Sequence, residues 1–214
     1  MSQTLSAPYA LPSLMLPPKR KVFVSSFHAD RREVDDFIFR WGKLGGLFTA
    51  NALATFDNDD LINSENPDYV MAQIRRRYLL DSSVTILLIG KCTHSRRYVD
   101  WELKSSLRRG MNVPNGLLAY VLPSAMPPAV NVFGEIPWTL RAWPNLPDRL
   151  AVNWNHDHPD QCYARYFVAP TSADQLRQQI EDAVWDRTNR AQLIKNEATM
   201  MGYNGRCRVC GVTH

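Results

Sequence analysis

A tyrosine and a glutamate four residues apart form the pair with the clearest capacity for chemistry. Tyr98 and Glu102 lie beyond an apolar run that ends at Gly90, and their spacing places both side chains on one helix face. Open α/β sheets bind ligands beyond the carboxyl ends of their strands, so a carboxylate on the following helix is well placed. We expect Glu102 to be partly exposed and ionised, favoured by the helix dipole, with Asp100 turned away. The alternative for a lone glutamate is a solvated surface position.

The segments around this pair alternate between the patterns of strands and helices. Apolar runs predict strands at residues 21–27, 84–89, 117–122 and 163–168, and a second strand within residues 47–56, chiefly at 52–56. Apolar residues at steps of three and four predict helices at residues 31–44, 67–80, 96–109 and 176–185, the last extending at most to residue 200. Asp30 is expected to cap the first helix. This alternation predicts an α/β fold, with a parallel sheet covered on both faces through right-handed crossovers.

Composition and charge narrow the class of protein. The chain of 214 residues is 45% hydrophobic and 21% charged, which is ordinary for a globular domain. Its apolar runs are too short to span a membrane, and its first residues lack the basic start of a secretion signal. Four cysteines without a disulfide framework fit a reducing compartment, so we expect a cytoplasmic protein. A net charge of +4 suits phosphate-bearing ligands and is too small to predict nucleic-acid binding.

We expect one domain at residues 19–190, between two flanking segments. Repeated prolines in residues 1–18 predict a disordered tail, and residues 191–214 are expected to be a C-terminal extension. The proline-rich residues 123–160 break the alternating pattern and predict an ordered insertion that wraps the sheet. Exposed indoles in one loop would form an unusual apolar patch, so its tryptophans are expected to be mostly buried. They are Trp138, Trp143 and Trp154.

The C-terminal extension contains two cysteines and a histidine at a spacing that suits zinc. Cys207, Cys210 and His214 supply three soft ligands, but a closed structural site needs a fourth. The sequence has no second cysteine pair, so we expect a frayed tail without metal. Cys92 has no base partner in the sequence and is expected to be a small buried residue.

Three segments of the sequence carry a resemblance to a known family: VFVSSF at residues 22–27, DSSVTILLIG at 81–90 and THSRRYVDWE at 93–102. Together they resemble the TIR-like family, and in particular its bacterial branch of ThsB-like proteins from the Thoeris anti-phage system. The resemblance spans roughly residues 20–122. It implies a flavodoxin-like sheet of five parallel strands in the order 2-1-3-4-5, with the switch point between the first and third strands.

The resemblance also implies that NAD is the substrate. In TIR enzymes a glutamate in the helix after the third strand cleaves NAD, typically within a Trp-x-x-x-Glu pattern. The matching residue here is Glu102. The chain departs from the pattern with Tyr98 at the tryptophan position, which keeps an aromatic ring there, and Trp101 adds a second ring. Because NAD is consumed, no resident cofactor or metal is expected.

Cleavage of the nicotinamide–ribose bond needs neither a metal nor an acid, because the pyridinium is already a cationic leaving group. Positive charge grows on the ribose in an oxocarbenium-like transition state, and an ionised Glu102 would stabilise that charge. The other expected substrate contacts come from aromatic rings and from polar groups near the first strand and the helix start: Ser25, Ser26, Phe27, His28, Tyr98, Trp101 and Arg96. The alternative for the rings is core packing, and for Arg96 it is a solvated helix start.

The residues are compatible with more than one outcome of cleavage. Water at the anomeric carbon gives ADP-ribose, whereas a hydroxyl or adenine nitrogen of the same molecule gives a cyclic product. The resemblance to Thoeris proteins implies a cyclic ADP-ribose isomer that signals to a downstream effector protein. The alternatives are a plain NAD hydrolase, a TIR adaptor that only assembles with other TIR domains, and a nucleotide receptor without turnover. A homo-oligomer is compatible with all of them, and no membrane or nucleic-acid partner is expected.

Overall fold

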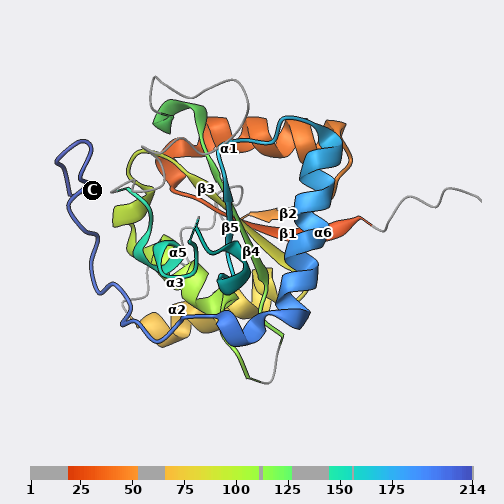
Figure 1. Ribbon diagram of the computed structural model, residues 1–214. Helices are drawn as coiled ribbons and strands as arrows, with labels where there is room; N and C mark the ends of the chain where they lie inside the picture. Colours follow the sequence, from red (N-terminus) through yellow and green to blue (C-terminus); the bar gives the residue numbers. More distant parts are fainter. Residues whose placement is uncertain (1–18, 53–65, 111–112, 127–144, 156, 214) are drawn as a thin grey trace, which may run out of the picture.

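Five parallel strands form one sheet in the order β2-β1-β3-β4-β5, as the sequence predicted. The computed structural model describes residues 19–52, 66–110, 113–126, 145–155 and 157–213 (Figure 1). The strands are β1 (Arg20–Ser25), β2 (Phe48–Ala52), β3 (Val84–Ile89), β4 (Gly116–Val121) and β5 (Arg165–Phe167). β3 and β4 are buried along their whole length, which explains their uninterrupted apolar sequences.

Helices cover both faces of the sheet, as predicted (Figure 1). The α-helices are α1 (Arg31–Phe37), α2 (Pro67–Ile74), α3 (Arg97–Ser106), α5 (Asp148–Ala151) and α6 (Ala173–Asn189). α1 and α2 run on as π-helical turns, Ile38–Leu44 and Arg75–Leu79. Short 3-10 turns lie at His28–Asp30, Thr93–Ser95, Pro123–Ala125, Pro159–Gln161 and Ala191–Leu193. α1 and α6 pack on one face, and α2, α3 and α5 pack on the other. No described helix has both the length and the apolarity needed to cross a membrane.

The second strand lies within the predicted range of residues 47–56, but it starts before residues 52–56, the part that was expected to form it. It occupies Phe48–Ala52, and residues 53–56 lie outside the described part of the chain. The π-helical turn ends at Leu44, Gly46 reverses the chain with a φ of +60°, and Phe48 is already buried under α1. The tight reversal therefore leaves only residues 45–47 between helix and strand.

The predicted insertion is described only in part. Trp138 and Trp143 lie outside the described residues. Trp154 is half-buried, with its ring edge-on to the ring of Tyr166 at a centroid distance of 5.0 Å. After α5, Asn153 accepts backbone hydrogen bonds from Tyr163 and Ala164 at 3.1 and 2.8 Å, which connects the insertion to the segment leading into β5.

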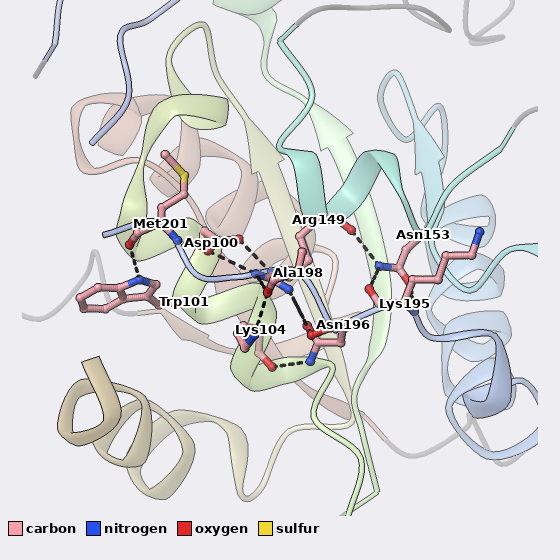
Figure 2. A network of polar contacts seen from close by, with 9 residues as sticks. All are labelled: Asp100, Trp101, Lys104, Arg149, Asn153, Lys195, Asn196, Ala198 and Met201. Atoms are coloured by element: carbon pink, nitrogen blue, oxygen red, sulfur yellow. Dashed lines mark hydrogen bonds and ion pairs between the residues drawn. The ribbon is translucent and has the colours of Figure 1, made fainter. Parts of the chain in front are cut away.

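The C-terminal segment (residues 194–213) packs across α3, so the expectation of a frayed tail is wrong for the residues that the structure describes. Figure 2 shows how side chains of α3 bond its backbone. The indole of Trp101 donates to the carbonyl of Met201 at 2.8 Å, and Lys104 donates to Ala198 at the same distance. Further along, the amide of Gly205 donates to the carbonyl of Ser95 at 2.8 Å.

A buried ion pair lies at the centre of this packing (Figure 2). The guanidinium of Arg149, in α5, donates to both carboxylate oxygens of Asp100 at 2.8 and 3.3 Å. Arg149 also donates to the side chain of Asn196 at 2.8 Å, and Asp100 accepts from the amide of Met201 at 2.9 Å. Asp100 points away from Glu102, as expected, but toward other parts of the protein and not toward solvent. The pair joins α3, the insertion and the C-terminal segment.

Replacing Asp100 by Asn should destabilise the protein strongly. The variant leaves the Arg149 guanidinium buried without its counter-ion, which typically costs about 3–5 kcal/mol. Urea denaturation followed by circular dichroism measures this loss. Asp174→Asn is the matched control, because the Asp174 side chain is 92% exposed and pairs only with Arg177 on the surface of α6. Equal midpoints for the two variants would contradict a structural role for the buried pair.

Replacing Gly116 by Ala should destabilise the packing of α6 on the sheet. A Cβ at Gly116 would lie 2.0 Å from the carbonyl oxygen of Ala183, and neither backbone can move alone. Such overpacking typically costs about 1–3 kcal/mol. Gly202→Ala is the control, since no heavy atom lies within 4 Å of the added carbon. A Gly116→Ala protein with parental stability in the same urea titration would show that α6 does not need this close approach.

Candidate functional site

The carboxyl ends of β1 and β3 lie side by side and define the switch point of the sheet. Ser25, the last residue of β1, is in register with Leu87 of β3. From this point the chain continues to β2 on one side and to β4 on the other. The crevice rule for open α/β sheets therefore places a ligand between the ends of these two strands, below the start of α3.

Glu102 lies at this edge, but it is buried and not partly exposed. Only 6% of the residue is exposed, and it accepts a hydrogen bond from the Ser25 hydroxyl at 2.5 Å. Tyr78, after α2, is close enough for the Glu102 charge to add to the effect of burial in raising the Tyr78 pKa. Among the described residues, no cation pairs with the Glu102 carboxylate.

Burial decides the protonation state of Glu102. It raises the pKa of Glu102 to about 8, although the Ser25 hydrogen bond acts in the opposite direction. The expectation that the helix dipole keeps this group ionised is therefore wrong. The dipole acts mainly in the first turn of a helix, and Glu102 lies beyond the first turn of α3. At neutral pH the carboxyl group is mostly protonated.

A second group of predicted residues surrounds the side chain of Arg96. Its guanidinium carbon lies 4.2 Å from the centroid of the Phe27 ring, and its Nε donates to the carbonyl of Cys92 at 3.2 Å. Arg96 is 4% exposed, so the solvated helix start that we considered is excluded. The ring of His28, which is exposed, lies edge-on to Phe27 at 4.5 Å. Ser26, which lies between Ser25 and Phe27 in the sequence, is half-buried.

Asp30 belongs to this second group and was missed by the sequence analysis as a site residue. It makes no capping hydrogen bond to α1, contrary to expectation. Its carboxylate lies against Gly90 so closely that a Cβ there would sit 2.0 Å from Oδ2. Burial and the neighbouring Glu33 raise the pKa of Asp30 to about 6, against the opposing effect of Arg96. Gly90 at the end of an apolar strand was the available signal, since glycine there admits a close approach.

The two aromatic residues of α3 form a third group, away from Ser25. Trp101 is 1% exposed and packs among the apolar side chains of α2. Its ring meets that of Tyr98 edge-on at 5.3 Å, and the Arg97 guanidinium lies over both rings at 4.8 and 5.5 Å. With its indole held by Met201, Trp101 has a packing role here. Tyr98, which is half-buried, keeps more freedom to meet a ligand.

Two cavities of the described structure lie elsewhere. One, of about 570 Å³, lies near the amino ends of β3 and β4 and is lined by Arg75, Arg108, Arg109 and Arg187. The other, of about 580 Å³, lies between α1 and the end of β4. Neither is lined by Ser25 or Glu102. We therefore place the candidate site by its chemistry, at the buried carboxyl group of Glu102.

Residues suited to a metal ion lie beside the site and not within it. The sulfur atoms of Cys92, Cys207 and Cys210 lie within 4.8 Å of one another. Because the Cys92 carbonyl accepts the Arg96 hydrogen bond, this cluster adjoins the second group of site residues.

The raised pKa of Glu102 predicts that stability depends on pH. The unfolded group ionises near its ordinary value of 4.5, whereas the folded group stays protonated up to about 8. Between these values the contribution of Glu102 to the unfolding free energy should fall by about 1.4 kcal/mol per pH unit. Glu102→Gln cannot ionise, so its stability relative to the parent should increase steadily from pH 5 to pH 8. Urea titrations across this range test it, and a constant difference would contradict the burial of an uncompensated carboxyl group.

A family match agrees with this geometry. Residues 23–120 match the family described as Thoeris protein ThsB, TIR-like domain. No curated protein matches the chain. The matched residues run from β1 to β4 and include Ser25, Asp30, Arg96 and Glu102, and the parallel order β2-β1-β3-β4-β5 is that of a flavodoxin-like fold. Residues 23–120 are therefore similar to the TIR-like domain of the Thoeris ThsB family, and the match supports a ThsB-like TIR domain in this part of the chain.

Proposed function

We propose that this domain cleaves the nicotinamide–ribose bond of NAD, with Glu102 as the catalytic carboxylate, and that it closes the ADP-ribose into a cyclic signalling product. The observation that carries the proposal is the buried Glu102 carboxyl group, which bonds Ser25 at the switch point of a TIR-like sheet. Breaking an N-glycosidic bond to a cationic leaving group requires a negative charge near the ribose.

The energetics of Glu102 support a functional role. A carboxyl group that is buried without a cation destabilises the fold at neutral pH, and a glutamine could bond Ser25 without that penalty. Asp100, two residues earlier, is also buried but has Arg149 as its counter-ion. A strongly perturbed carboxyl group in a ligand-binding crevice is a typical property of catalytic sites.

The substrate itself can bring Glu102 into the ionised form. A nearby positive charge lowers the pKa of a carboxyl group, and the nicotinamide ring of NAD carries such a charge. Binding would therefore release the Glu102 proton and leave a carboxylate in a poorly solvated site. There it acts on the growing charge of the ribose with little screening by water. The Ser25 hydroxyl holds the carboxylate and does not neutralise it.

The remaining groups suit the rest of the NAD molecule. Arg96 supplies positive charge for the pyrophosphate, and its stacking on Phe27 fixes the direction of the guanidinium. Ser26 and His28, which are more exposed, can bond ribose hydroxyls, and Tyr98 offers a ring for stacking. Because Glu102 is buried, these contacts require the crevice between the ends of β1 and β3 to open.

Burial of the carboxylate favours cyclisation over hydrolysis. A site that excludes water leaves the oxocarbenium carbon to a nucleophile of the same molecule, either a hydroxyl or an adenine nitrogen. The cyclic product would then act on a downstream effector protein. A plain hydrolase admits water to the same carbon. An adaptor function requires no buried carboxyl group at this position.

Glu102→Gln should abolish turnover while keeping the fold. Removing a preorganised electrostatic contact lowers turnover by about 100- to 1000-fold. Purified parent and variant are incubated with NAD, with and without lysate of phage-infected cells, and free nicotinamide is measured by chromatography. For the parent, kcat/KM should rise with pH toward about 8, because this ratio reports the free enzyme. Mass spectrometry separates a cyclic product from ADP-ribose, which is heavier by one water.

The matched control is Glu197→Gln, because the Glu197 side chain is 76% exposed and lies outside the site. It should cleave NAD at the parental rate. Parental turnover by Glu102→Gln would remove Glu102 from the mechanism. Absence of nicotinamide from the parent under every condition would favour an adaptor or a nucleotide receptor, which NAD binding by calorimetry then distinguishes.

A further inference from the structure

Three cysteines from distant parts of the chain converge on one point. Cys92 lies in the turn after β3, and Cys207 and Cys210 lie in the C-terminal segment. The Cys92 sulfur is 3.0 Å from that of Cys207 and 3.5 Å from that of Cys210. All three sulfur atoms lie within 4.8 Å of one another. Cys92 is half-buried and lies beside two other sulfur atoms, so the expectation that it is merely a small buried residue is wrong.

The backbone around Cys207 and Cys210 forms a tight turn that directs both sulfur atoms to the same side. The amide of Gly211 donates to the carbonyl of Cys207 at 2.8 Å, and Gly211 has a φ of +72°, which favours glycine. The amide of Cys207 donates to Val212 at 2.9 Å and closes the turn. The amides of Val209 and Cys210 approach the Cys207 sulfur, where they would stabilise a thiolate.

We propose that Cys92, Cys207 and Cys210 bind one thiophilic divalent ion of the zinc class. Zinc binds cysteine sulfur at about 2.3 Å, so tetrahedral geometry separates two ligand sulfurs by about 3.8 Å. The Cys92 sulfur lies 3.0 and 3.5 Å from the other two, somewhat closer than this value, and all three sulfurs lie within 4.8 Å of one another, so small side-chain rotations suffice. Each thiol gives up its proton as it binds the ion.

The geometry favours a metal ion over a disulfide. A disulfide between Cys92 and Cys207 would use two sulfur atoms and leave Cys210 beside the bond without a function. A tetrahedral ion uses all three and keeps a fourth position, which water or one further side chain can fill. His94 supports the site from outside the cluster, because its Nε2 accepts a hydrogen bond from the amide of Arg208 at 3.1 Å. Second-layer contacts of this kind orient metal ligands.

A bound ion would link the C-terminal segment, through Cys207 and Cys210, to the turn that contains Cys92 and Arg96. The carbonyl of Cys92 accepts hydrogen bonds from the Ser95 hydroxyl at 2.9 Å and from Arg96 Nε at 3.2 Å. Holding Cys92 therefore also holds the groups next to the crevice. The metal site itself does not depend on NAD cleavage, and its occupancy can be measured on protein without substrate.

The metal content of the purified full chain tests the proposal. Protein made in zinc-supplemented medium and purified under reducing conditions should hold about one zinc per chain by mass spectrometry of the metal. Cys92→Ser, Cys207→Ser and Cys210→Ser should each lower zinc affinity at least about tenfold, because even outer contacts contribute that much. Cys162→Ser is the matched control and should keep its zinc. Cys162 is also buried, but it bonds the carbonyls of Asn155 and His158, away from the cluster.

A second measurement keeps the test valid if a serine variant fails to fold. The parent is stripped with a chelator, reloaded with Zn²⁺ or Co²⁺, and alkylated, and the modified cysteines are mapped by mass spectrometry. Metal should protect the three clustered cysteines together, and cobalt should give thiolate charge-transfer absorption. Reduced protein that takes up neither ion would overturn the proposal. So would zinc retained in the Cys92→Ser protein, or a native disulfide within the cluster.

Discussion

Helix α3 is covered on every side, and most of the structure around it follows from that constraint. Five consecutive residues, 99–103, are buried, and two of them are acidic. A helix in this position must find partners for its charges inside the protein. Asp100 receives Arg149 from the insertion and an amide from the C-terminal segment, whereas Glu102 receives, from the described part of the chain, only a hydroxyl from β1. The Asp100 carboxylate therefore stabilises the fold, whereas the burial of the Glu102 carboxyl group destabilises it at neutral pH.

The short turn after β3 serves two parts of the protein. It begins at Gly90, which admits the Asp30 carboxylate, and it ends at Arg96, which stacks on Phe27. Between them, Cys92 faces the C-terminal segment. A change in the position of this turn would therefore move the polar groups at the sheet edge and the cysteine cluster together. The polar groups at the sheet edge and the cysteine cluster are therefore positioned by the same turn, although their side chains have different chemistry.

Local patterns predicted the sheet well because the strands are buried and their apolar runs are unambiguous. Val84–Ile89 was predicted residue for residue, and the strand order followed from the resemblance. The location of Glu102 could also be predicted, but its burial could not. The residues that cover α3 lie about 100 positions further along the chain, as the bond from Trp101 to Met201 shows. The approach of Cys92 to Cys207, 115 residues apart, has the same origin. The spacing of apolar residues indicates which helix or strand a segment forms. It does not indicate which distant segment will pack against that element.

The position of the C-terminal segment has a consequence for how the protein is made. Domains generally fold from the amino end as synthesis proceeds. The sheet order allows β1 to β4 to assemble early, yet residues 194–213 emerge after everything that they cover. Until then the indole of Trp101 and the carboxylate of Asp100 lack the backbone partners supplied by Met201. A nascent chain therefore exposes the helix of the candidate site until residues 194–213 have been translated, and this delay sets the earliest time at which α3 can be fully covered.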